Sequence, residues 1–598
     1  MGLLRPTFMG FETAKRSIEV NQKALDIVAN NLTNADTAGY TRQRLDVSSI
    51  APQAYRAKVA GTRIGVLGQG VEALGVGQIR DKFLDKRFRE EYTKAAYHDQ
   101  AAKLLKDVQA ALGDGGDISD ESVLFGSFAR IFKSLNDYIY EPTLESQANI
   151  VMAAMRDFTQ VMRHLDLKLN TVTKNLIEDV NLDVARVNEI FKEIAYYNEI
   201  ISSDAEVMSN PYNEYFRPNE LLDKRNLLLD ELAAFGDIHV KELATGMINV
   251  EFAGKLAVNG KEHEVIRAET RSDLTIDIVW NATGQTLRLG GGTLKANLDF
   301  LNGRGRNIQN SYETEYEGVP YYRDRLNSLA VAFANVLNNT IPERAYPYEA
   351  GNNEPLRDAE GKIIYKTLIG ASQDENTFIP PGTVISTGVY LPAGTLDRGG
   401  RILTEDTAVP PGYVLPEDVL LALEASGRLP KGIVPSEPPY GLKLKLGEVL
   451  PGGQGLITAG NITLSREWMT NGAGYFIFSK QENIVNYAQQ LVNNLTLNND
   501  TKFVSFGETF MGTFEEYVTD YVSKLGSQIK YQEGRYESTA MIADDFLDRR
   551  DEISGVSRDE ETANMLIFQK SYNAAARLMT TLDDMVDIII NRMGRVGL

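Results

Sequence analysis

The chain has 598 residues, 43% of them hydrophobic; this length exceeds what one hydrophobic core usually organises and predicts three or four structural units. Its 82 acidic and 62 basic residues give a net charge of -20, which argues against nucleic-acid and anionic membrane partners. The absence of cysteine excludes disulfides, thiolate metal sites and cysteine nucleophiles. No apolar run is long enough to span a bilayer and no cleavage site follows the first residues, so we expect neither membrane insertion nor a cleaved signal peptide.

The first predicted element is a helix with a narrow apolar stripe. Small or apolar residues recur at alternating steps of three and four, and one polar position interrupts them. This spacing predicts the seam of a coiled coil. The seam positions are Phe11, Ala14, Ile18, Asn21, Leu25, Val28 and Leu32.

The segment ANNLTNADTAGYTRQ, residues 29–43, predicts the end of this helix. The side chains of Asn30, Asn31 and Asn34 compete for backbone hydrogen bonds, and Gly39 can adopt the positive φ of a helix-ending turn. A single asparagine and a glycine would suffice to end a helix. We therefore expect the additional polar side chains to be presented to a neighbouring subunit.

Long helices with two breaks are predicted between Asp81 and Leu232. The breaks are LGDGGDISDES near residue 113 and SNPYNEYFRPNE near residue 209, and the pattern indicates a helical bundle. Between residues 238 and 290, the runs IHVKEL, MINVEF, KLAVN, LTIDIVW and QTLRLG predict antiparallel strands. Helical spacing returns at Leu326.

Residues 345–460 differ in composition from the rest of the chain. Pro-Pro and Gly-Gly pairs separate short runs such as GTVISTGVYL and LKLKLGEVL. This pattern predicts an inserted, outward-facing β-rich domain. Helical periodicity resumes at Gln481 and continues through Phe514 and Tyr521.

The last predicted helix carries a second heptad seam. It begins at SRDE, a capping box from Ser557 to Glu560, and we expect it to pair with the first helix. A two-helix pair leaves flanking apolar residues such as Leu566, Leu578 and Ile588 exposed, and further copies of the chain or related proteins could cover them. The seam positions are Met565, Phe568, Tyr572, Ala575, Met579, Leu582, Val586, Ile589 and Met593.

These elements predict a multidomain α+β fold with long terminal coiled-coil helices, a helical bundle with small antiparallel β segments, and an inserted β-rich domain. The predicted units are a terminal coiled-coil domain of residues 1–50 and 555–598, a helical shaft of residues 51–344 and 461–554 with β segments at 238–290, and the insertion at 345–460.

The sequence shows no pattern of a metal, cofactor or catalytic site. The histidines are dispersed and form no close ligand pair. The acidic loop near residue 114 lacks the spacing of a calcium loop, so it predicts a solvated linker rather than a cation site. We therefore expect neither an enzyme nor a cofactor. The histidines are His98, His164, His239 and His263, and the loop residues are Asp114, Asp117, Asp120 and Glu121.

Residues 29–43 resemble the N-terminal signature of bacterial flagellar axial proteins, a family of rod, hook and hook-filament junction proteins. YTRQ, beginning at Tyr40, and SGVSRDEETANMLIFQKSYNAAARLM, residues 554–579, are similar to the first hook-associated protein rather than to rod or hook proteins. Thr33, Asp36 and Ala38 depart from the signature. The resemblance continues, in kind and order, in residues 68–89, 218–232, 322–338 and 462–471.

The resemblance implies a structural protein of the bacterial flagellum that forms the adaptor ring between hook and filament. It implies an extracellular location, reached through the flagellar type III export apparatus, and ordering of both chain ends on assembly. The implied partners are further copies of the chain, the hook protein, a second junction protein toward the filament, and an export chaperone. The implied assembly residues are the two seams together with Asn30, Asn31, Asn34, Gly39, Tyr40 and Arg42.

Two other functions are open on the sequence. Another axial component, such as a hook-like protein, would share the terminal seams, although YTRQ and SGVSRDEE argue against it. Residues 345–460 could instead make the chain an adhesin or a carbohydrate-binding protein anchored to the flagellum. A glycan array with the isolated segment would distinguish that function, because a plain spacer should bind no glycan.

Overall fold

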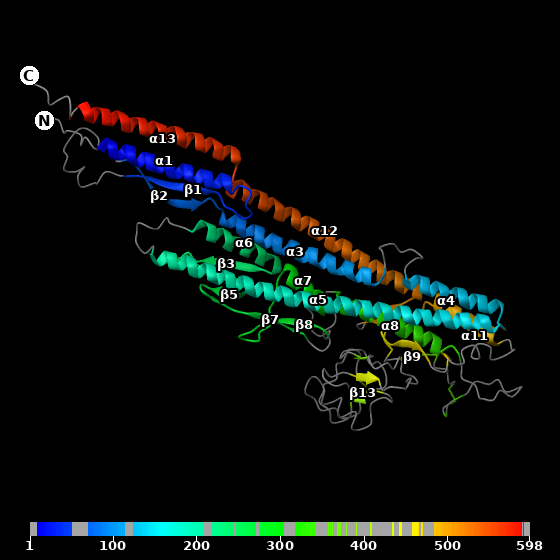
Figure 1. The fold of residues 1–598 in the computed structure, drawn as a ribbon. Coiled ribbons are helices and arrows are strands. Elements are labelled where there is room, and N and C mark those ends of the chain that lie inside the picture. The colour runs from blue at the N-terminus through cyan, green and yellow to red at the C-terminus, as the bar shows by residue number, and fades with distance from the viewer. Residues whose placement is uncertain are drawn as a thin grey trace, which may run out of the picture.

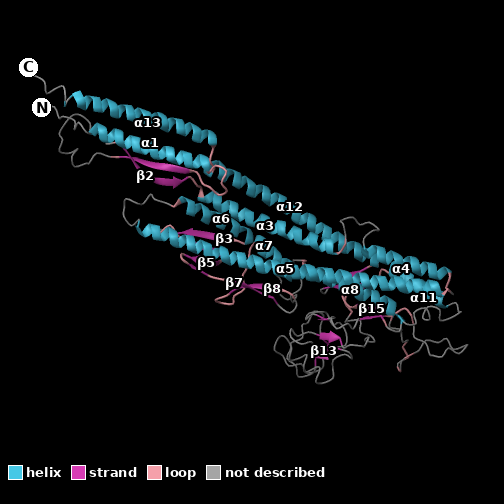
Figure 2. Cartoon of the chain, in the orientation of Figure 1, coloured by secondary structure: helices cyan, strands magenta, loops and turns pink. Residues whose placement is uncertain are grey.

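The computed structural model shows a long, narrow body in which the first and last helices lie at the same end (Figure 1). Helices run along the body, and small sheets lie beside them (Figure 2). The structure describes residues 9–50, 70–113, 123–142, 144–207, 218–243, 245–270, 274–303, 317–341, 457–465, 468–469, 483–505, 508–588 and 590, with shorter pieces between 357 and 444.

The terminal unit is formed by both ends of the described chain. Helices α1 (Met9–Thr33) and α13 (Arg558–Asp587) pack along each other, which confirms the predicted pairing of the chain ends. Strands β1 (Gln43–Ser49) and β2 (Val71–Gln78) form an antiparallel pair that contacts α1. The predicted domain boundary at residue 50 is therefore wrong, because it divides this sheet.

The shaft contains the remaining helices. Helices α3 and α12 pack along each other and lead away from the terminal unit, and the 63-residue helix α5 follows the shaft (Figure 1). The breaks predicted near residues 113 and 209 are confirmed by the ends of α3 and α5. The shaft helices are α3 (Lys82–Ala111), α4 (Val123–Tyr140), α5 (Glu145–Val207), α6 (Asn219–Phe235), α7 (Gly292–Asn302), α8 (Val319–Asn338), α11 (Asn483–Thr496) and α12 (Phe514–Ser554).

Short antiparallel strands pack against α5, as predicted for residues 238–290. Strands β3 to β6 form one sheet in chain order, and β7 pairs with β8. The prediction of a strand at QTLRLG is wrong: Thr286 makes an isolated bridge to Val279, while Leu287 and Leu289 contribute buried side chains to the core. The strands are β3 (Ile238–Glu242), β4 (Ile248–Phe252), β5 (Lys255–Asn259), β6 (Glu262–His263), β7 (Ile266–Thr270) and β8 (Ile276–Trp280).

The predicted insertion at 345–460 lies mostly outside the described residues. Strand β9 (Ile369–Ala371) pairs with β15 (Ile462–Leu464), and both are buried in the shaft core, so the shaft extends past residue 345 on that side. The other described strands in the region form two small sheets, which are β10 (Phe378–Ile379), β13 (Ile433–Pro435) and β14 (Leu442–Leu444), and β11 (Tyr390–Leu391) with β12 (Thr407–Ala408).

Strands β16 (Lys502–Ser505) and β17 (Glu508–Met511) form a hairpin where helical periodicity was predicted. Burial alternates along β16, with Phe503 buried and Val504 exposed, as expected for a strand with one face on the core. The Phe503 ring stacks on Tyr517 of α12 with 4.1 Å between ring centroids. This four-residue alternation is too short to outweigh the helical periods on either side of it.

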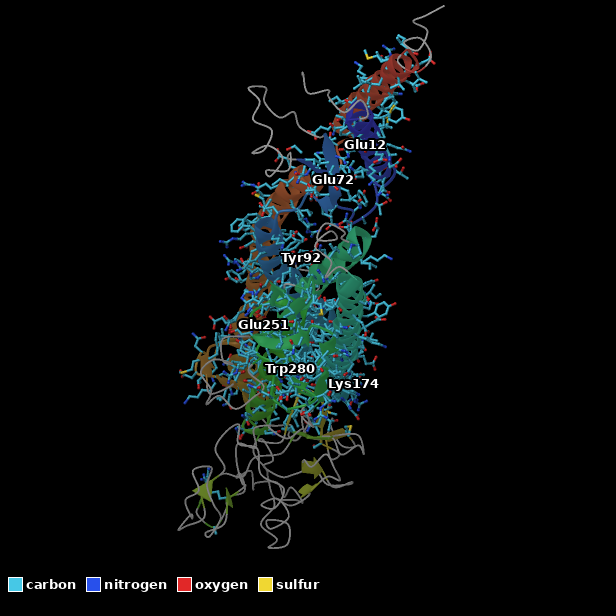
Figure 3. The ribbon with its side chains drawn as sticks, turned by 90° about the vertical axis from the view of Figure 1, so that its left-hand side faces the viewer. Glu12, Glu72, Tyr92, Lys174, Glu251 and Trp280 are labelled. Atoms are coloured by element: carbon cyan, nitrogen blue, oxygen red, sulfur yellow. The ribbon has the colours of Figure 1, made fainter. Side chains whose placement is uncertain are left out.

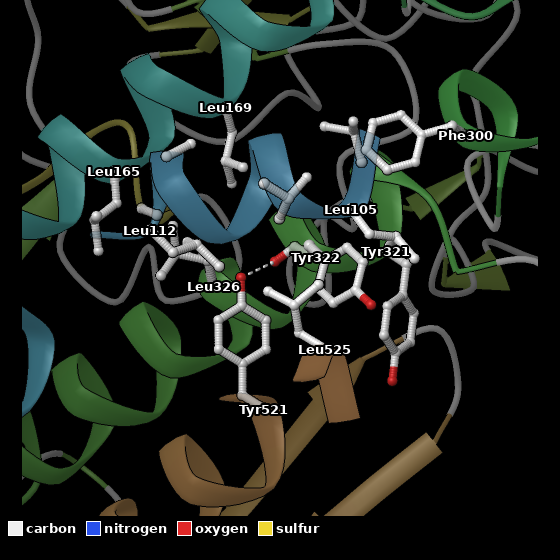
Figure 4. Close-up of a cluster of buried hydrophobic side chains, with 14 of the residues drawn as sticks. Leu105, Leu112, Leu165, Leu169, Phe300, Tyr321, Tyr322, Leu326, Tyr521 and Leu525 are labelled. Atoms are coloured by element: carbon white, nitrogen blue, oxygen red, sulfur yellow. Dashed lines mark hydrogen bonds between the residues drawn. The ribbon is translucent and has the colours of Figure 1, made fainter. Parts of the chain in front are cut away.

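The shaft core joins α3, α5, α8 and α12 to the sheets. Figure 4 shows a part where Tyr322 and Leu326 of α8 meet Tyr521 and Leu525 of α12. The Tyr521 hydroxyl donates to the backbone carbonyl of Tyr322 at 3.1 Å, so the polar end of a buried ring is satisfied.

Four asparagines in the described part of the shaft tie a helix to a strand in the same way. The side-chain Nδ2 donates to the backbone oxygen of the strand's first residue, and Oδ1 accepts that residue's N–H, with distances of 2.8 to 3.1 Å. The amide thus takes the place of a neighbouring strand and satisfies both backbone groups. The ties join Asn188 to Ile266, Asn198 to Ile248, Asn302 to Ile276 and Asn338 to Ile369.

Asp183 on α5 should make the stability of the shaft depend on pH. Burial, reinforced by the charge of Asp179, raises the pKa of Asp183 to about 6 from an ordinary 3.8. The folded state therefore binds this proton more tightly than the unfolded state, and the group lowers the free energy of unfolding as the pH rises from about 4 to 6. Replacing Asp183 with asparagine should raise the melting temperature at pH 7 by about 2 °C and leave it unchanged at pH 4.

Calorimetry of both proteins at the two pH values measures this effect. Glu178→Gln, an exposed change one helical turn away, is the matched control and should have no effect at either pH. An equal increase for Asp183→Asn at pH 4 and pH 7 would show that the gain has no connection with ionisation.

Candidate assembly site at the paired chain ends

Helices α1 and α13 meet along a line that is shifted on α1 from the predicted seam. The most buried positions of α1 are Ala14, Ala24, Val28 and Asn31, each exposed by 3% or less. Small residues on α1 let large side chains of α13 approach the backbone: the methyl carbons of Leu582 lie 3.1 Å from where a Cβ on Gly10 would stand. The sequence pattern placed Leu25 in the seam, whereas the structure places Ala24 deeper.

Most predicted seam residues are half-buried within one chain. On α13 the predicted positions whose side chains are described are half-buried, except for Ala575, which is buried. The side chains of Ile589 and Met593 lie outside the described residues. The pairing of α1 with α13 therefore covers part of each seam. The half-buried seam residues are Phe11, Ile18, Leu25, Leu32, Met565, Phe568, Tyr572, Met579, Leu582 and Val586.

Helix α13 also carries a row of exposed apolar side chains, which we call the outer stripe. Its members are exposed by 46% to 57%, and the predicted exposure of Leu566, Leu578 and Ile588 is confirmed. An apolar row of this length is characteristic of an interaction surface rather than of a solvated helix face. The outer stripe consists of Leu566, Ile567, Leu578, Met585 and Ile588.

The turn after α1 is held by hydrogen bonds within itself. The backbone N–H of Asn34 donates to the carbonyl of Asn30 at 3.0 Å, and the two side-chain amides bond at 2.9 Å. The backbone N–H of Thr37 donates to the carbonyl of Asn34, and that of Tyr40 to the carbonyl of Thr37. Asn30 and Asn34 therefore close the turn, as asparagines at helix ends commonly do.

Asn31 lies at the centre of the site and ties α1 to β1 and α13. It is 1% exposed, and its Nδ2 donates to the carbonyl of Gln43 at 2.9 Å and to the Glu561 carboxylate at 3.1 Å. Its Oδ1 accepts the N–H of Gln43 at 3.0 Å and the Tyr40 hydroxyl at 2.8 Å. Gln43 is the first residue of β1, so this is a fifth helix-to-strand tie of the kind found in the shaft.

Arg42 clamps the turn to both C-terminal helices. Its N–H donates to the carbonyl of Ser554, the last residue of α12, at 2.8 Å. Its guanidinium bonds to the Glu561 carboxylate at 2.8 Å and to that of Glu560 at 2.7 Å. Because the Glu561 side chain is 2% exposed, removing Arg42 would leave a buried charge without its partner.

These contacts correct two sequence interpretations. The predicted capping box at SRDE is half formed: Ser557 accepts the N–H of Glu560, but the Glu560 carboxylate binds Arg42. The side chains of Asn31, Tyr40 and Arg42 were expected to face a neighbouring subunit, but they bond within the chain. The excess of polar residues is needed because the turn must hold the opposite end of the chain.

The sequence did not indicate Glu561 or Asp223 as residues of this site. Asp223 belongs to the shaft and accepts hydrogen bonds from the terminal unit. Asp223 on α6 accepts the N–H of Thr41 at 3.2 Å and Nε2 of Gln78 at 2.8 Å. Three consecutive carboxylates, Asp559, Glu560 and Glu561, begin α13, but acidic residues are favoured in the first turn of any helix, so this pattern does not single out Glu561. No local pattern distinguishes Asp223 from other acidic residues on a solvated helix.

Gly39 should tolerate no side chain. Its φ is +76°, and a Cβ there would lie 2.5 Å from Cγ of Leu227 on α6. Gly39→Ala should therefore weaken the contact between the turn and the shaft by about 1 to 3 kcal/mol, through backbone conformation and overpacking together. Hydrogen exchange of residues 30–43 measures the loss. Adding Leu227→Ala should restore part of the protection, and no change in either variant would contradict the contact.

The described residues contain neither a membrane-spanning helix nor a cluster of metal-ligating side chains. None of the described helices is both long and apolar enough to cross a bilayer. Within the same residues, no three histidine or acidic side chains converge as a metal site requires. The acidic loop of Asp114, Asp117, Asp120 and Glu121 lies outside the described part of the chain.

Comparisons with known proteins match this architecture piece by piece. The family model "Flagella basal body rod protein" matches residues 13–41, which are α1 and its turn. The model "Flagellar basal body rod FlgEFG protein C-terminal" matches residues 548–593, which include α13. The model "Flagellar hook-associated protein FlgK helical domain" matches residues 116–341 of the shaft.

Curated relatives match nearly the whole chain. Flagellar hook-associated protein 1 of Bacillus subtilis is 24% identical over 99% of both chains, and that of Salmonella typhimurium is 23% identical over 97% of this chain and 98% of its own. The solved structure of the flagellar hook junction protein FlgK from Burkholderia pseudomallei is similar over 80% of this chain and 100% of its own, with 14% identity and a TM-score of 0.44. Over nearly its whole length, therefore, the chain is similar to flagellar hook-associated protein 1.

Proposed function

We propose that this protein forms the adaptor ring between the hook and the filament of the bacterial flagellum, and that its terminal unit carries the assembly contacts. The observation that carries the proposal is the terminal unit itself: two paired helices that leave most seam residues only half-buried and the outer stripe exposed. The near-full-length match to hook-associated proteins supports the position in the flagellum.

Assembly would proceed by covering the outer stripe. Burying one large apolar side chain stabilises a contact by about 1.5 to 3 kcal/mol, so covering the outer stripe adds to the seam contacts that oppose the cost of ordering a terminal helix. An isolated two-helix unit of this kind is marginal. The pairing of α1 with α13 would therefore gain stability when neighbouring subunits pack on it, which couples full ordering of the chain ends to incorporation.

The partners in this proposal are further copies of the chain, the hook protein on one side and a second junction protein on the filament side. The chain would leave the cell unfolded, through the flagellar type III export apparatus and without a cleaved signal peptide. Before export, the outer stripe offers an apolar helix face that a dedicated chaperone could hold in a groove. The role is structural and includes no catalytic step.

Deleting the gene in its own organism tests the proposal. Electron microscopy should show hooks without filaments, and flagellin should accumulate in the medium because export continues while attachment fails. Expression of the unaltered gene from a plasmid should restore filaments. Normal filaments on the deletion strain would overturn the junction role, and a strain lacking hooks as well would place the protein earlier in the axis.

A further inference from the structure

The turn between β5 and β6 contains an asparagine followed by a glycine, a pair that is open to deamidation because glycine has no side chain to shield its nitrogen. Asn259 ends β5, and Gly260 and Lys261 form the loop before β6. Gly260 has a φ of +59°, and a positive φ at the first loop position of a hairpin favours glycine. In Figure 3 this part of the shaft lies around Glu251, a residue of the neighbouring strand β4.

Deamidation at such a pair needs no enzyme. The backbone nitrogen of the glycine loses its proton to a base, attacks the side-chain carbonyl carbon of the asparagine and expels ammonia, which leaves a succinimide ring. Water then opens the ring at either of its carbonyl carbons and gives aspartate or isoaspartate. In isoaspartate the chain continues through the former side chain, so the backbone is longer by one carbon atom.

The fold holds both backbone groups of Gly260. Its N–H donates to Oδ1 of Asn249 on β4 at 2.9 Å, and its carbonyl accepts from Nδ2 of Asn198 on α5 at 2.7 Å. Gly260 is buried, whereas Asn259 is exposed. The proton that must leave first therefore points at an amide oxygen, which is not a base, and it is shielded from hydroxide in the solvent. Because the attacking nitrogen is held, the reaction requires the turn to open.

A second Asn-Gly pair, Asn302 and Gly303 at the end of α7, is protected in the opposite way. Here the asparagine is held: Oδ1 of Asn302 accepts the N–H of Ile276 at 2.9 Å, and Nδ2 donates to the carbonyl of Ile276 at 2.8 Å. The side-chain carbonyl carbon therefore cannot turn toward the glycine nitrogen. The third pair in the sequence, Asn471 and Gly472, lies outside the described residues.

We propose that Asn259 is a deamidation site that is open in the unfolded chain and closed by folding, and that Asn249 is the residue that closes it. Isoaspartate at position 259 would lengthen the backbone just before Gly260 and move the Gly260 carbonyl away from Asn198. Asn198 also ties α5 to β4 through Ile248, so the modified chain would fold with this sheet less firmly fixed to the helix. The modification would thus record how long a chain had stayed unfolded.

Mass spectrometry of the full chain tests the site, because electron-transfer fragmentation distinguishes isoaspartate from aspartate. The chain is kept at pH 8.5, either folded or unfolded in urea, and the peptides that contain Asn259 and Asn302 are compared. Both residues should convert in urea. In the folded chain both conversions should be slower by at least about tenfold, because they then require local opening. Equal rates in the two conditions, or no conversion of Asn259 in urea, would overturn the proposal.

Asn249→Ala tests whether this residue closes the site. In the folded variant Asn259 should convert faster than in the parent, because solvent can reach the N–H of Gly260, while Asn302 should convert as slowly as in the parent. Glu251→Ala, an exposed change on the same strand, should leave Asn259 protected. An unchanged rate at Asn259 in the folded Asn249→Ala chain would remove Asn249 from the proposed role.

The conversion of Asn302 is an internal control for folding, since a variant that failed to fold would convert at both residues. If Asn249→Ala behaves in that way, Asn249→Leu removes the same acceptor while keeping the size of the side chain, and faster conversion of Asn259 alone is again the expected result. Protection of Asn259 in folded Asn249→Leu would contradict the proposal. These measurements use the isolated chain and a part of the shaft away from the chain ends, so their outcome is independent of the flagellar role.

Discussion

Replacing Asn31 with aspartate should separate the two chain ends at neutral pH. The change removes the Nδ2 group that donates to both the Gln43 carbonyl and the Glu561 carboxylate. It also places a second carboxylate about 3 Å from that of Glu561. Two buried like charges and an unpaired backbone carbonyl should destabilise the terminal unit by at least about 3 kcal/mol. Hydrogen exchange in α1 and α13 should rise to the rate of unstructured peptide, while the shaft keeps its protection.

Asn30→Asp is the matched control for this change. Asn30 lies in the same turn but is half-buried. Its Oδ1 accepts from Asn34, so a carboxylate preserves that bond and loses only the 3.3 Å bond from Nδ2 to the Tyr40 hydroxyl. Lowering the pH should partly restore the Asn31→Asp variant, because protonation removes the repulsion. If α13 stays protected in the Asn31→Asp variant at neutral pH, the tie between Asn31 and Glu561 does not hold the ends together.

Leu582→Asp should abolish incorporation into flagella without unfolding the shaft. Leu582 packs against the backbone of Gly10, and a carboxylate there would replace this apolar contact and stand beside the charges of the exposed Asp583 and Asp584. We expect a loss of about 3 kcal/mol in the pairing of α1 with α13, which exceeds what a marginal two-helix unit can absorb. Cells carrying the variant should export the protein, lack filaments and release flagellin.

A second substitution separates the seam from the outer stripe. Leu578→Asp changes an exposed residue, so it should leave the pairing of α1 with α13 intact in the isolated chain but still block incorporation. Asn573→Asp, an exposed change on the same helix, should be incorporated normally. Normal filaments with Leu578→Asp would remove the outer stripe from the assembly surface and leave the seam as the contact.

The long periodic elements could be predicted from the sequence because many residues report the same period. The helices α1 and α13, the breaks near residues 113 and 209, and the strands between 238 and 280 are of this kind. The predictions of short elements were wrong, because only a few residues carry the periodicity there. Thr286 forms a bridge instead of a strand, and the hairpin around Phe503 lies between two helical periods.

The sequence indicated most residues of the site but not their hydrogen-bond partners. The excess of asparagines in ANNLTN is visible in the sequence, yet the partner of Asn31 is Glu561, 530 positions away, and no local rule supplies it. Arg42 and Glu560 show the same limit: a glutamate three residues after a capping serine predicts a local bond, and a distant guanidinium takes its carboxylate instead. Contacts between opposite chain ends depend on tertiary structure that periodicity cannot supply.

The five asparagine ties determine where insertions and deletions can occur. Each tie fixes the start of a strand to a position on a helix, so the register of the strand follows from the helix and not from the loop between them. A residue added in such a loop changes its closure entropy slightly and moves neither element. A residue added within the helix, before the asparagine, turns the amide by about 100° and detaches the strand. Insertions and deletions among relatives should therefore occur mainly in the segments after Asn31, Asn198 and Asn338. They should be rare in the helical turns before these asparagines.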